Sequence, residues 1–348
     1  MWYDKLIEKG LIPEWLLRLV VRLHLEYRLS KQPTSIEEIQ NHLNKFIKTM
    51  NKSPITIEIN KANEQHYEVP TEFFQIILGQ RLKYSCGYWE KKIPRKNLID
   101  LLDKSEEDML ELTCKRAKIE DGQEILELGC GWGSLVFYML EHFHLSKYTA
   151  ITNSNSQKKH IEKVAKEKKI DNLRVIKTDI SEIDVEGKYD RILSIEMFEH
   201  VRNYGKLLSK ISNFLKESGM LFIHIFTDKN YPYFYELNSS SGWMARYFFR
   251  GGLMPSADLL LYFTDQLSVE KVWRVNGTHY RRTLDAWLQK MKKNKEQIIP
   301  ILEDSYGKEN AKKWWNYWKI FLISCSEAFG IHDGNQRFVS HYLLQKGG

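Results

Sequence analysis

Two carboxylates and an imidazole, Glu196, Glu199 and His200, stand within five residues of one another directly after residues 189–195. That segment, which ends in Ile-Leu-Ser-Ile, is expected to be a strand. Charged groups at the end of such a strand are costly as structure alone, so we interpret them as a reactive site. A carboxylate there can hold a cationic group, and a neighbouring histidine or glutamate can accept a proton from it.

A second candidate site follows an earlier strand, where residues 125–133 read Ile-Leu-Glu-Leu-Gly-Cys-Gly-Trp-Gly. An amphipathic segment, residues 134–143, comes directly after the glycines. This order predicts a strand that turns sharply into a helix, where a ligand can approach the backbone and meet the free N–H groups of the helix. Sites for NAD, FAD and S-adenosylmethionine (SAM) all use such a loop, so the loop alone does not identify the ligand.

Residues at the ends of neighbouring strands favour SAM over a dinucleotide. Glu127 can pair with the ammonium of the methionine portion of SAM, whereas it would repel a pyrophosphate. Thr152 and Asn153 stand where a dinucleotide site prefers an acidic residue, and Asp179 and Ile180 suit an adenine amino group beside an apolar contact. We therefore expect SAM as the cofactor and S-adenosyl-L-homocysteine (SAH) as its product. We expect no metal, because methyl transfer from SAM is an in-line displacement that needs none.

The elements that must position these residues alternate between strands and helices. The expected strands are residues 124–128, 148–152, 173–177, 189–195 and 219–226, and the expected helices between them are residues 134–143, 156–168 and 204–215. This alternation predicts an α/β fold with a Rossmann-like, mostly parallel sheet and helices on both faces. Ligands of such sheets bind beyond the carboxyl ends of the strands, which is where the candidate residues stand.

Helical segments flank the α/β pattern. We expect helices over residues 14–29, 35–50, 98–117, 283–302 and 309–329, and two late strands over residues 267–275 and 337–344. Ser35 and Glu38 form a capping box for the second of these helices. We expect residues 1–85 to be an N-terminal helical region with a loop that covers SAM and substrate. Residues 86–348 would be the SAM-binding core, with a C-terminal helical cap inserted at about 228–262 and 281–335.

Composition narrows the classes of function. Of the 348 residues, 43% are apolar and 28% are charged, as in ordinary globular proteins. The net charge of +7 is spread over mixed lysine and carboxylate segments, so we expect no nucleic-acid partner. The four cysteines are widely spaced, which argues against zinc and disulfides and suits a reducing compartment. Early charges in place of a signal-peptide core favour a cytoplasmic location.

Residues 16–23 are apolar except for Arg18 and Arg22, and this stretch is too short to span a bilayer. It could lie on a membrane surface as a basic amphipathic helix, or pack on its own domain, which we favour. The sequence leaves a homodimer open as the oligomeric state.

Several of these segments together resemble a known family. They are residues 84–89, 127–133, 152–157, 189–200, 254–256 and 277–280. From about Leu11 onward the sequence resembles the SAM-dependent methyltransferases of the cyclopropane fatty acid synthase family, and more closely its coclaurine and pavine N-methyltransferase branch. The resemblance implies a class I methyltransferase fold. It also implies that the following residues bind SAM: Tyr84, Ser85, Gly129, Gly131, Thr152, Asn153, Gln157, Asp179 and Ile180.

The resemblance also implies the chemistry at the fourth strand. In the N-methyltransferases, the positions matching Glu196 and His200 hold the substrate ammonium and accept its proton, and Glu199 stands between them. We therefore expect a SAM-dependent N-methyltransferase that acts on a small or medium amine, aromatic or alkaloid-like.

The alternative is a cyclopropane synthase reaction on an unsaturated acyl chain, which would bring the protein to a membrane. Those synthases hold a bicarbonate base, and residues matching its ligands are all present here: Cys86, Glu199, His224 and Tyr280. Whether they bind bicarbonate stays open. Phe226 stands where the synthases have isoleucine, and Glu196 stands where they typically have glycine. A carboxylate serves no purpose facing an alkene, so residue 196 favours the amine.

Weaker candidates line the expected substrate pocket: Cys86, His224, Phe226, Tyr280 and Trp318. The aromatic clusters at residues 243–249 and 314–321 could be core or could cage a cationic amine. His66 and Tyr67 could be loop structure or could contact substrate. A SAM-binding protein without catalysis is disfavoured, because every expected site residue is present.

Overall fold

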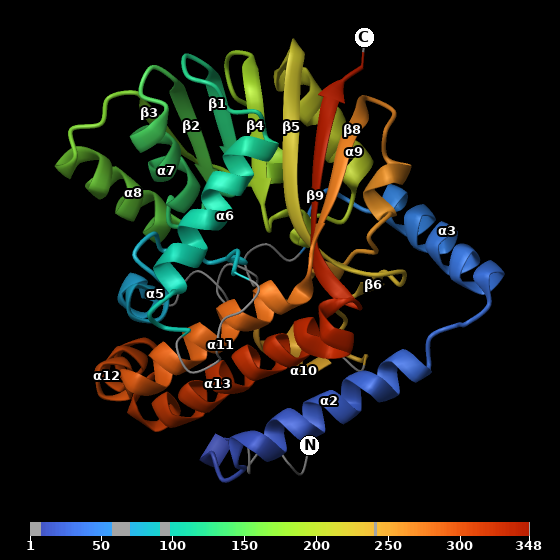
Figure 1. Cartoon of the computed structure of the whole chain (residues 1–348), viewed down its shortest axis with the longest axis vertical. Helices are drawn as coiled ribbons and strands as arrows, with labels where there is room; N and C mark the ends of the chain where they lie inside the picture. Colours follow the sequence, from blue (N-terminus) through green and yellow to red (C-terminus); the bar gives the residue numbers. More distant parts are fainter. Residues whose placement is uncertain (1–7, 58–69, 91–97, 240–241, 348) are drawn as a thin grey trace. The chain divides into compact units, whose positions relative to one another are not determined.

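The computed structural model describes residues 8–57, 70–90, 98–239 and 242–347. The chain gathers into two compact units, each built from segments that are far apart in the sequence (Figure 1). Unit 1 comprises Met1–Gln32, Val69–Asp108 and Asn276–Arg337, and unit 2 comprises Pro33–Glu68, Met109–Val275 and Phe338–Gly348. The division at residue 85 that the sequence suggested stays a prediction.

Unit 2 is built on a seven-stranded sheet with the order β3-β2-β1-β4-β5-β9-β8. The strands are β1 Glu124–Leu128, β2 Lys147–Thr152, β3 Leu173–Lys177, β4 Tyr189–Ile195, β5 Leu215–Asp228, β8 Leu267–Val275 and β9 Arg337–Lys346. Strands β1 to β5 pair in parallel, and β8 and β9 pair antiparallel. The predicted mostly parallel α/β sheet is confirmed. Its order reverses between β1 and β4, the place where such sheets bind ligands.

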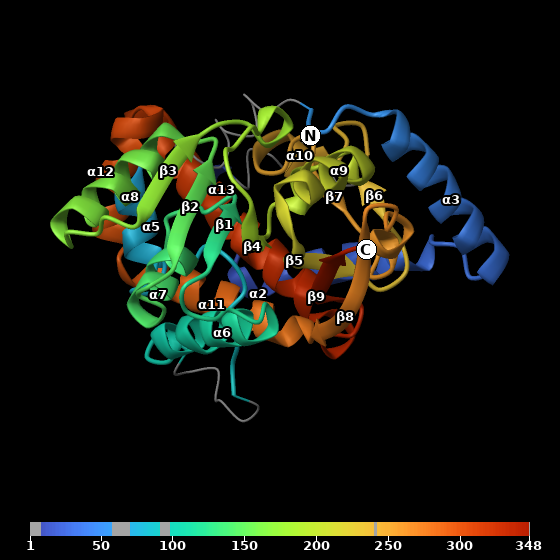
Figure 2. The same cartoon turned by 90° about the horizontal axis from the view of Figure 1, so that it is seen from above.

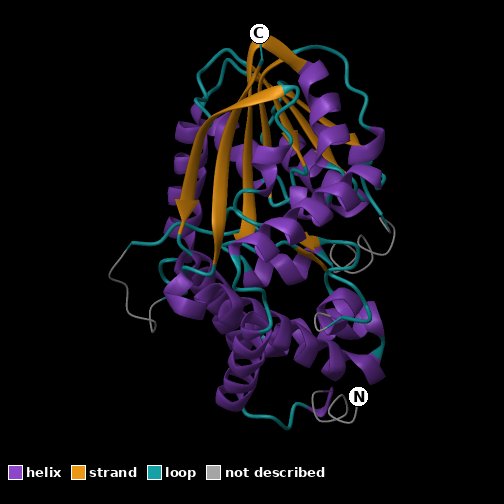
Figure 3. Cartoon of the chain, turned by 90° about the vertical axis from the view of Figure 1, so that its right-hand side faces the viewer, coloured by secondary structure: helices purple, strands orange, loops and turns teal. Residues whose placement is uncertain are grey.

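Helices cover both faces of this sheet (Figures 2 and 3). They are α3 Ile36–Lys52, α7 Ser134–His142, α8 Asn155–Glu167, α9 Tyr204–Phe214 and the part of α6 (Leu102–Arg116) that belongs to unit 2. Neighbouring residues of one strand point to opposite faces: Ile125 of β1 packs in one core with α6 and α7, and Leu126 packs in another with α3 and α9. Two cores therefore clamp the central strands and fix where their ends point.

Short elements occupy the described part of residues 228–262 of unit 2, a segment that the sequence predicted to be part of the helical cap. They are β6 Tyr233–Phe234, α10 Gly242–Tyr247, β7 Leu253–Met254 and a 3₁₀ turn, η4 Leu259–Tyr262. The predicted cap of α3 is also present, since the Ser35 hydroxyl accepts the Glu38 backbone N–H at 3.5 Å. No helix in the described ranges is long and apolar enough to cross a membrane.

Unit 1 is helical, with α2 Glu14–Ser30, α5 Thr71–Ile77, α11 Gly277–Lys293, α12 Lys295–Tyr306 and α13 Lys308–Gly330. The single helix expected over residues 283–302 was wrong, because α11 begins six residues earlier, at Gly277, and ends before Asn294. The Asn276 side chain caps α11 by accepting the Thr278 N–H at 2.9 Å. A Cβ on Gly277 would lie 2.0 Å from the Arg337 carbonyl oxygen, so only glycine fits that first turn. Tyr280 consequently lies in a helix and not at a strand end.

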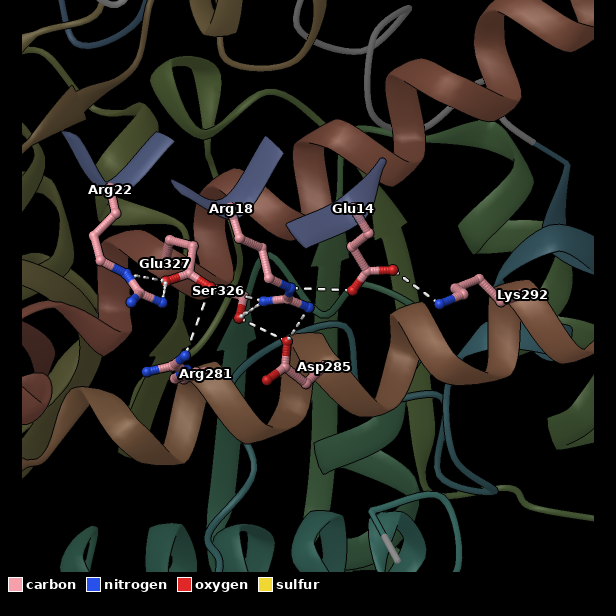
Figure 4. A network of polar contacts seen from close by, with 8 residues as sticks. All are labelled: Glu14, Arg18, Arg22, Arg281, Asp285, Lys292, Ser326 and Glu327. Atoms are coloured by element: carbon pink, nitrogen blue, oxygen red, sulfur yellow. Dashed lines mark hydrogen bonds and ion pairs between the residues drawn. The ribbon is translucent and has the colours of Figure 1, made fainter. Parts of the chain in front are cut away.

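Helix α2 is attached to unit 1 by charged groups on its inner face (Figure 4). Arg18 and Arg22 reach the two carboxylate oxygens of Glu327 in α13 at 2.9 and 2.7 Å, and Arg18 also bonds Asp285 of α11 at 2.9 Å. Leu17 and Leu25 of α2 are buried, whereas Trp15 and Leu23 on its outer side are 67% and 61% exposed, so apolar packing and charged contacts together account for the attachment. The helix is packed on its own unit, as the favoured interpretation of residues 16–23 predicted.

Candidate functional site

The glycine turn after β1 is fastened to β2 and left open on its other side. Gly129 and Gly131 have left-handed φ angles of 76° and 54°. The backbone N–H groups of Gly129 and Cys130 both donate to the Ile151 carbonyl oxygen, at 3.0 and 2.8 Å. A Cβ built on Gly131 would meet nothing within 4 Å. The turn is therefore held rigidly while its backbone stays bare for a ligand.

Glu127 brings a carboxylate to the end of β1 with only 3% of the residue exposed. Burial, and next the charge of Glu127, raises the pKa of the Cys114 thiol to about 12 and raises that of Cys130 well above its ordinary value. Both cysteines are inert thiols. A buried carboxylate beside a bare glycine turn fits a ligand that carries an ammonium group, as SAM does.

The predicted cofactor residues after β2 bond one another. The Thr152 hydroxyl donates to the Gln157 side-chain oxygen at 2.6 Å, and it accepts the Ser154 N–H at 3.1 Å. Gln157 is buried in the first turn of α8, and Asn153 follows β2 directly. The roles of this pair toward a ligand stay predictions.

Asp179 follows β3 and caps the short 3₁₀ turn η2 (Ile180–Glu182). Its Oδ1 accepts the Ser181 N–H at 2.7 Å, the Ser181 hydroxyl, and the Thr56 hydroxyl at 3.3 Å. An adenine amino group would thus be met by Oδ2, with Ile180 beside it. The ends of β1, β2 and β3 carry these residues on one edge of a single sheet.

Glu196, directly after β4, has a left-handed φ of 49°, which is unusual for a residue with a side chain. Its backbone N–H donates to the His224 carbonyl oxygen at 2.8 Å, and its carboxylate Oε1 lies 3.2 Å from His224 Nε2. Strained backbone of this kind persists where surrounding bonds enforce it and is concentrated at functional sites. Both His224 contacts hold the strained turn in place.

Glu199 lies in the next turn, η3 (Phe198–His200), and is 0% exposed. Its Oε1 accepts the Phe226 N–H at 2.8 Å, whereas Oε2 has no hydrogen-bond partner among the residues the structure describes. Burial, and next the charge of Glu196, raises the pKa of Glu199 well above its ordinary value. The Glu199 carboxyl therefore favours its neutral form beside Glu196.

His200 is the last residue of η3, and its ring packs against aromatic side chains. Its ring lies 4.6 Å from that of Phe249, which in turn lies 5.8 Å from Phe226 and 4.8 Å from Tyr235. Burial lowers the pKa of His200 to about 4, opposed by the charge of Glu196. The imidazole is neutral at pH 7 and keeps a lone pair.

Two residues that the sequence did not suggest belong to this cluster. His341 of β9 lies 2.9 Å from His224, and Arg116 of α6 lies 2.7 Å from His341. Nothing local distinguishes them, since His341 follows an ordinary strand pattern and Arg116 ends an ordinary helix. Phe249 was also missed, although the sequence singled out the aromatic segment in which it lies.

The remaining predicted residues belong to unit 1. The Tyr84 ring lies 5.5 Å from Trp287, and the Ser85 hydroxyl accepts a bond from Lys83 Nζ at 2.5 Å. Cys86 is fully buried, Tyr280 stacks on Phe329 at 4.4 Å, and Trp318 packs 4.8 Å from Phe73. Their roles toward a ligand stay predictions, and His66 and Tyr67 lie outside the described residues. Within the described ranges, no three or more His, Cys, Asp or Glu side chains gather as metal ligands would.

The sheet order and the residues at its strand ends define a class I SAM-dependent methyltransferase. The family model for mycolic acid cyclopropane synthetase matches residues 56–336, so the chain belongs to this family.

Similar proteins place it more narrowly. (S)-coclaurine N-methyltransferase of Thalictrum flavum subsp. glaucum is 37% identical over 98% of this chain and 94% of its own. Pavine N-methyltransferase of the same plant is 33% identical over 98% and 96%. The crystal structure of a coclaurine N-methyltransferase bound to N-methylheliamine and SAH is 35% identical, has a TM-score of 0.93 and covers 99% of this chain and 98% of that one. The predicted branch is confirmed, and the protein is an enzyme of the SAM-dependent N-methyltransferase type.

Proposed function

We propose that the protein transfers a methyl group from SAM to the nitrogen of a small or medium amine of aromatic or alkaloid-like kind. The observation that carries this proposal is Glu196, a carboxylate held in a strained turn at the end of β4. A negative group there suits a cationic nitrogen. The relatives named for coclaurine and pavine, both amines, support the same class of substrate.

The strand ends suit SAM, which supplies an electrophilic methyl group when bound. Glu127 would pair with its ammonium, the bare backbone at Gly131 would accept close approach, and Asp179 would bind the adenine amino group. The structure of the coclaurine enzyme with SAH supports this assignment. Tyr84 and Ser85 complete the proposed set.

The reaction requires an amine lone pair, and an aliphatic amine is protonated at neutral pH. Glu196 binds the ammonium. Glu199 is already protonated at that pH and cannot take a second proton, whereas the neutral His200 has a lone pair to receive one. Because a pKa of about 4 makes His200 a weak base, we expect the proton transfer to limit the rate near pH 7.

The alternative, cyclopropane formation with a bicarbonate base, is less favoured by the geometry. His224, one of the matching bicarbonate residues, has its Nε2 3.2 Å from the Glu196 carboxylate. An anion bound beside His224 would be repelled by that carboxylate.

The test is a parallel incubation of the protein with methyl-labelled SAM, one set with primary to tertiary amines and one with unsaturated phospholipid vesicles. We expect label in at least one amine and none in lipid. Label in lipid together with none in any amine would overturn the proposal. The Glu196→Gly variant is the control: it should lose amine methylation while isothermal titration shows nearly unchanged SAM affinity.

A further inference from the structure

A single file of four side chains runs from the α6 helix to the strained turn after β4. Arg116 NH1 lies 2.7 Å from His341 Nδ1, His341 Nε2 lies 2.9 Å from His224 Nδ1, and His224 Nε2 lies 3.2 Å from Glu196 Oε1. Both imidazoles are 0% exposed. The four groups come from four elements, all within unit 2.

Strand pairing and aromatic contacts fix the two imidazoles. His224 pairs with Ile195 in the β4–β5 ladder, and His341 pairs with Trp273 in the β8–β9 ladder. The Phe222 ring meets the His341 ring edge-on at 5.1 Å, and the Arg116 guanidinium lies 5.1 Å from the Trp273 ring. These aromatic neighbours shield the four side chains from water, and this exclusion of water strengthens the hydrogen bonds between them.

The direction of the hydrogen bonds follows from the arginine. A guanidinium is always protonated and can only donate, so His341 Nδ1 must be the acceptor and the proton of that ring sits on Nε2. His341 Nε2–H then donates to His224 Nδ1, which places the His224 proton on Nε2 as well. His224 in turn donates to Glu196, and the bond between them is one from a neutral imidazole and not an ion pair.

We propose that Arg116 and His341 are positioning residues of the methyl-transfer site, because they hold His224 neutral and aim its N–H at the Glu196 carboxylate. This inference rests on the proposed binding of an ammonium by Glu196. An imidazolium at residue 224 would neutralise Glu196 and compete with the substrate cation. A neutral ring holds the carboxylate in place and leaves its negative charge for the amine.

The first test reads the protons directly and requires no activity. The protein is labelled with ¹⁵N-histidine, long-range ¹H–¹⁵N spectra are recorded at pH 7, and the two signals are assigned by their loss in His224→Gln and His341→Gln. We expect both rings to be neutral with the proton on Nε2. A cationic His224, or one with its proton on Nδ1, would overturn the proposal whatever the enzyme methylates.

The second test uses matched variants of the two positioning residues. His341→Leu and Arg116→Met remove the hydrogen bonds, whereas His341→Gln and Arg116→Lys keep a donor or an acceptor in place. We expect the first pair to raise the KM for the amine by about tenfold, the effect of losing one hydrogen bond to a charged group, with unchanged SAM affinity. The conservative pair should stay within about threefold of the parent.

The outcomes separate a positioning role from a structural one. An equal rise of the KM for the amine in the conservative and disruptive variants, or a parallel loss of SAM affinity, would mean that the four side chains only support the fold. An unchanged KM in Arg116→Met with an unchanged His224 signal would also refute the proposal. If the parent protein methylates no amine, the proposed function fails, and the ¹⁵N spectra still decide the proton arrangement.

Discussion

Each unit of the protein contains a buried polar network, and the two are built in opposite ways. In unit 1 the arginine network (Arg18, Arg22, Arg281, Asp285, Ser326 and Glu327) surrounds its carboxylates with donors: Arg18 and Arg22 bond one oxygen each of Glu327, and Arg281 lies 3.5 Å away. In unit 2 the carboxyl pair consists of Glu196 and Glu199. Within the described chain, one oxygen of Glu199 has no hydrogen-bond partner.

The difference appears in the ionisation of two glutamates that are equally buried. The side chain of Glu327 is 1% exposed and Glu199 is 0% exposed. Burial opposes ionisation of Glu327, but hydrogen bonds from Arg18 and Arg22 outweigh it and hold its pKa below the ordinary value. Burial and the Glu196 charge raise the pKa of Glu199. Arginine partners therefore keep Glu327 ionised in a network that stabilises the fold, whereas Glu199 is held in its neutral form by burial and the neighbouring charge.

The largest effect that we expect is the loss of activity in Glu196→Gln. Glutamine keeps an oxygen for the His224 N–H but cannot attract an ammonium, so kcat/KM for the amine should fall by about 10³-fold. The free energy of unfolding, from urea titration, should change by less than about 0.5 kcal/mol, because no buried charge is left unpaired. Activity within tenfold of the parent would remove Glu196 from the mechanism.

The opposite result is expected for Glu327→Gln. Removing this carboxylate takes an ion-pair partner from both Arg18 and Arg22 and should cost about 3 kcal/mol of unfolding free energy, measured by urea denaturation. The kcat of the remaining folded protein should be that of the parent. Lys292→Gln, whose partner Glu14 lies at the exposed rim of the same helix contact, is a control that should cost less than about 1 kcal/mol. A stability loss of that small size in Glu327→Gln would contradict a structural role for the arginine network.

Sequence reasoning located the carboxyl pair because its signal is local. Charged residues directly after one strand pattern, and a glycine turn after another, are readable from the sequence. The strands 124–128, 173–177, 189–195 and 267–275 have the predicted bounds. Burial in the middle of the sheet imposes the apolar residues of β1 and β4, and polar residues follow their ends. The family resemblance then named Glu196 and His200 from the same short segments.

The hydrogen-bonded row of side chains Arg116, His341, His224 and Glu196 could not be predicted in that way. Its contacting pairs are 225, 117 and 28 residues apart in the sequence, and their meeting depends on β9 lying next to β5 with His341 opposite Trp273. A shift of one residue in that register would turn His341 to the other face. The start of α11 was a different failure, since the Asn276-Gly277 cap signal was present in the sequence and was overlooked.

Acid stability should distinguish the two networks by pH. Because the pKa of His200 is lowered to about 4 in the folded protein, the unfolded chain binds the extra proton first, and stability falls as pH drops from about 6.5 to about 4. Glu327 contributes stability above about pH 4.5 that is lost only below it. When the pH is lowered from 7 to 5, the unfolding free energy of His200→Gln should therefore fall by up to about 2 kcal/mol less than that of the parent. The upper value applies if water is fully excluded from the His200 ring. Urea titrations at both pH values measure this, and equal losses in the two proteins would contradict a neutral, buried His200.

The smallest effect concerns redundancy in the arginine network. The Ser326 hydroxyl donates to Asp285 Oδ1 at 2.7 Å and accepts from Arg18 at 3.3 Å, but Arg18 also bonds Asp285 and Glu327 directly. Ser326→Ala should consequently cost only about 1 kcal/mol of unfolding free energy, since both partners keep other hydrogen bonds. In the row of side chains from Arg116 to Glu196, each ring nitrogen makes one hydrogen bond to the next member, so removing His341 interrupts the row. A cost above about 3 kcal/mol for Ser326→Ala would show that the arginine network also depends on single contacts.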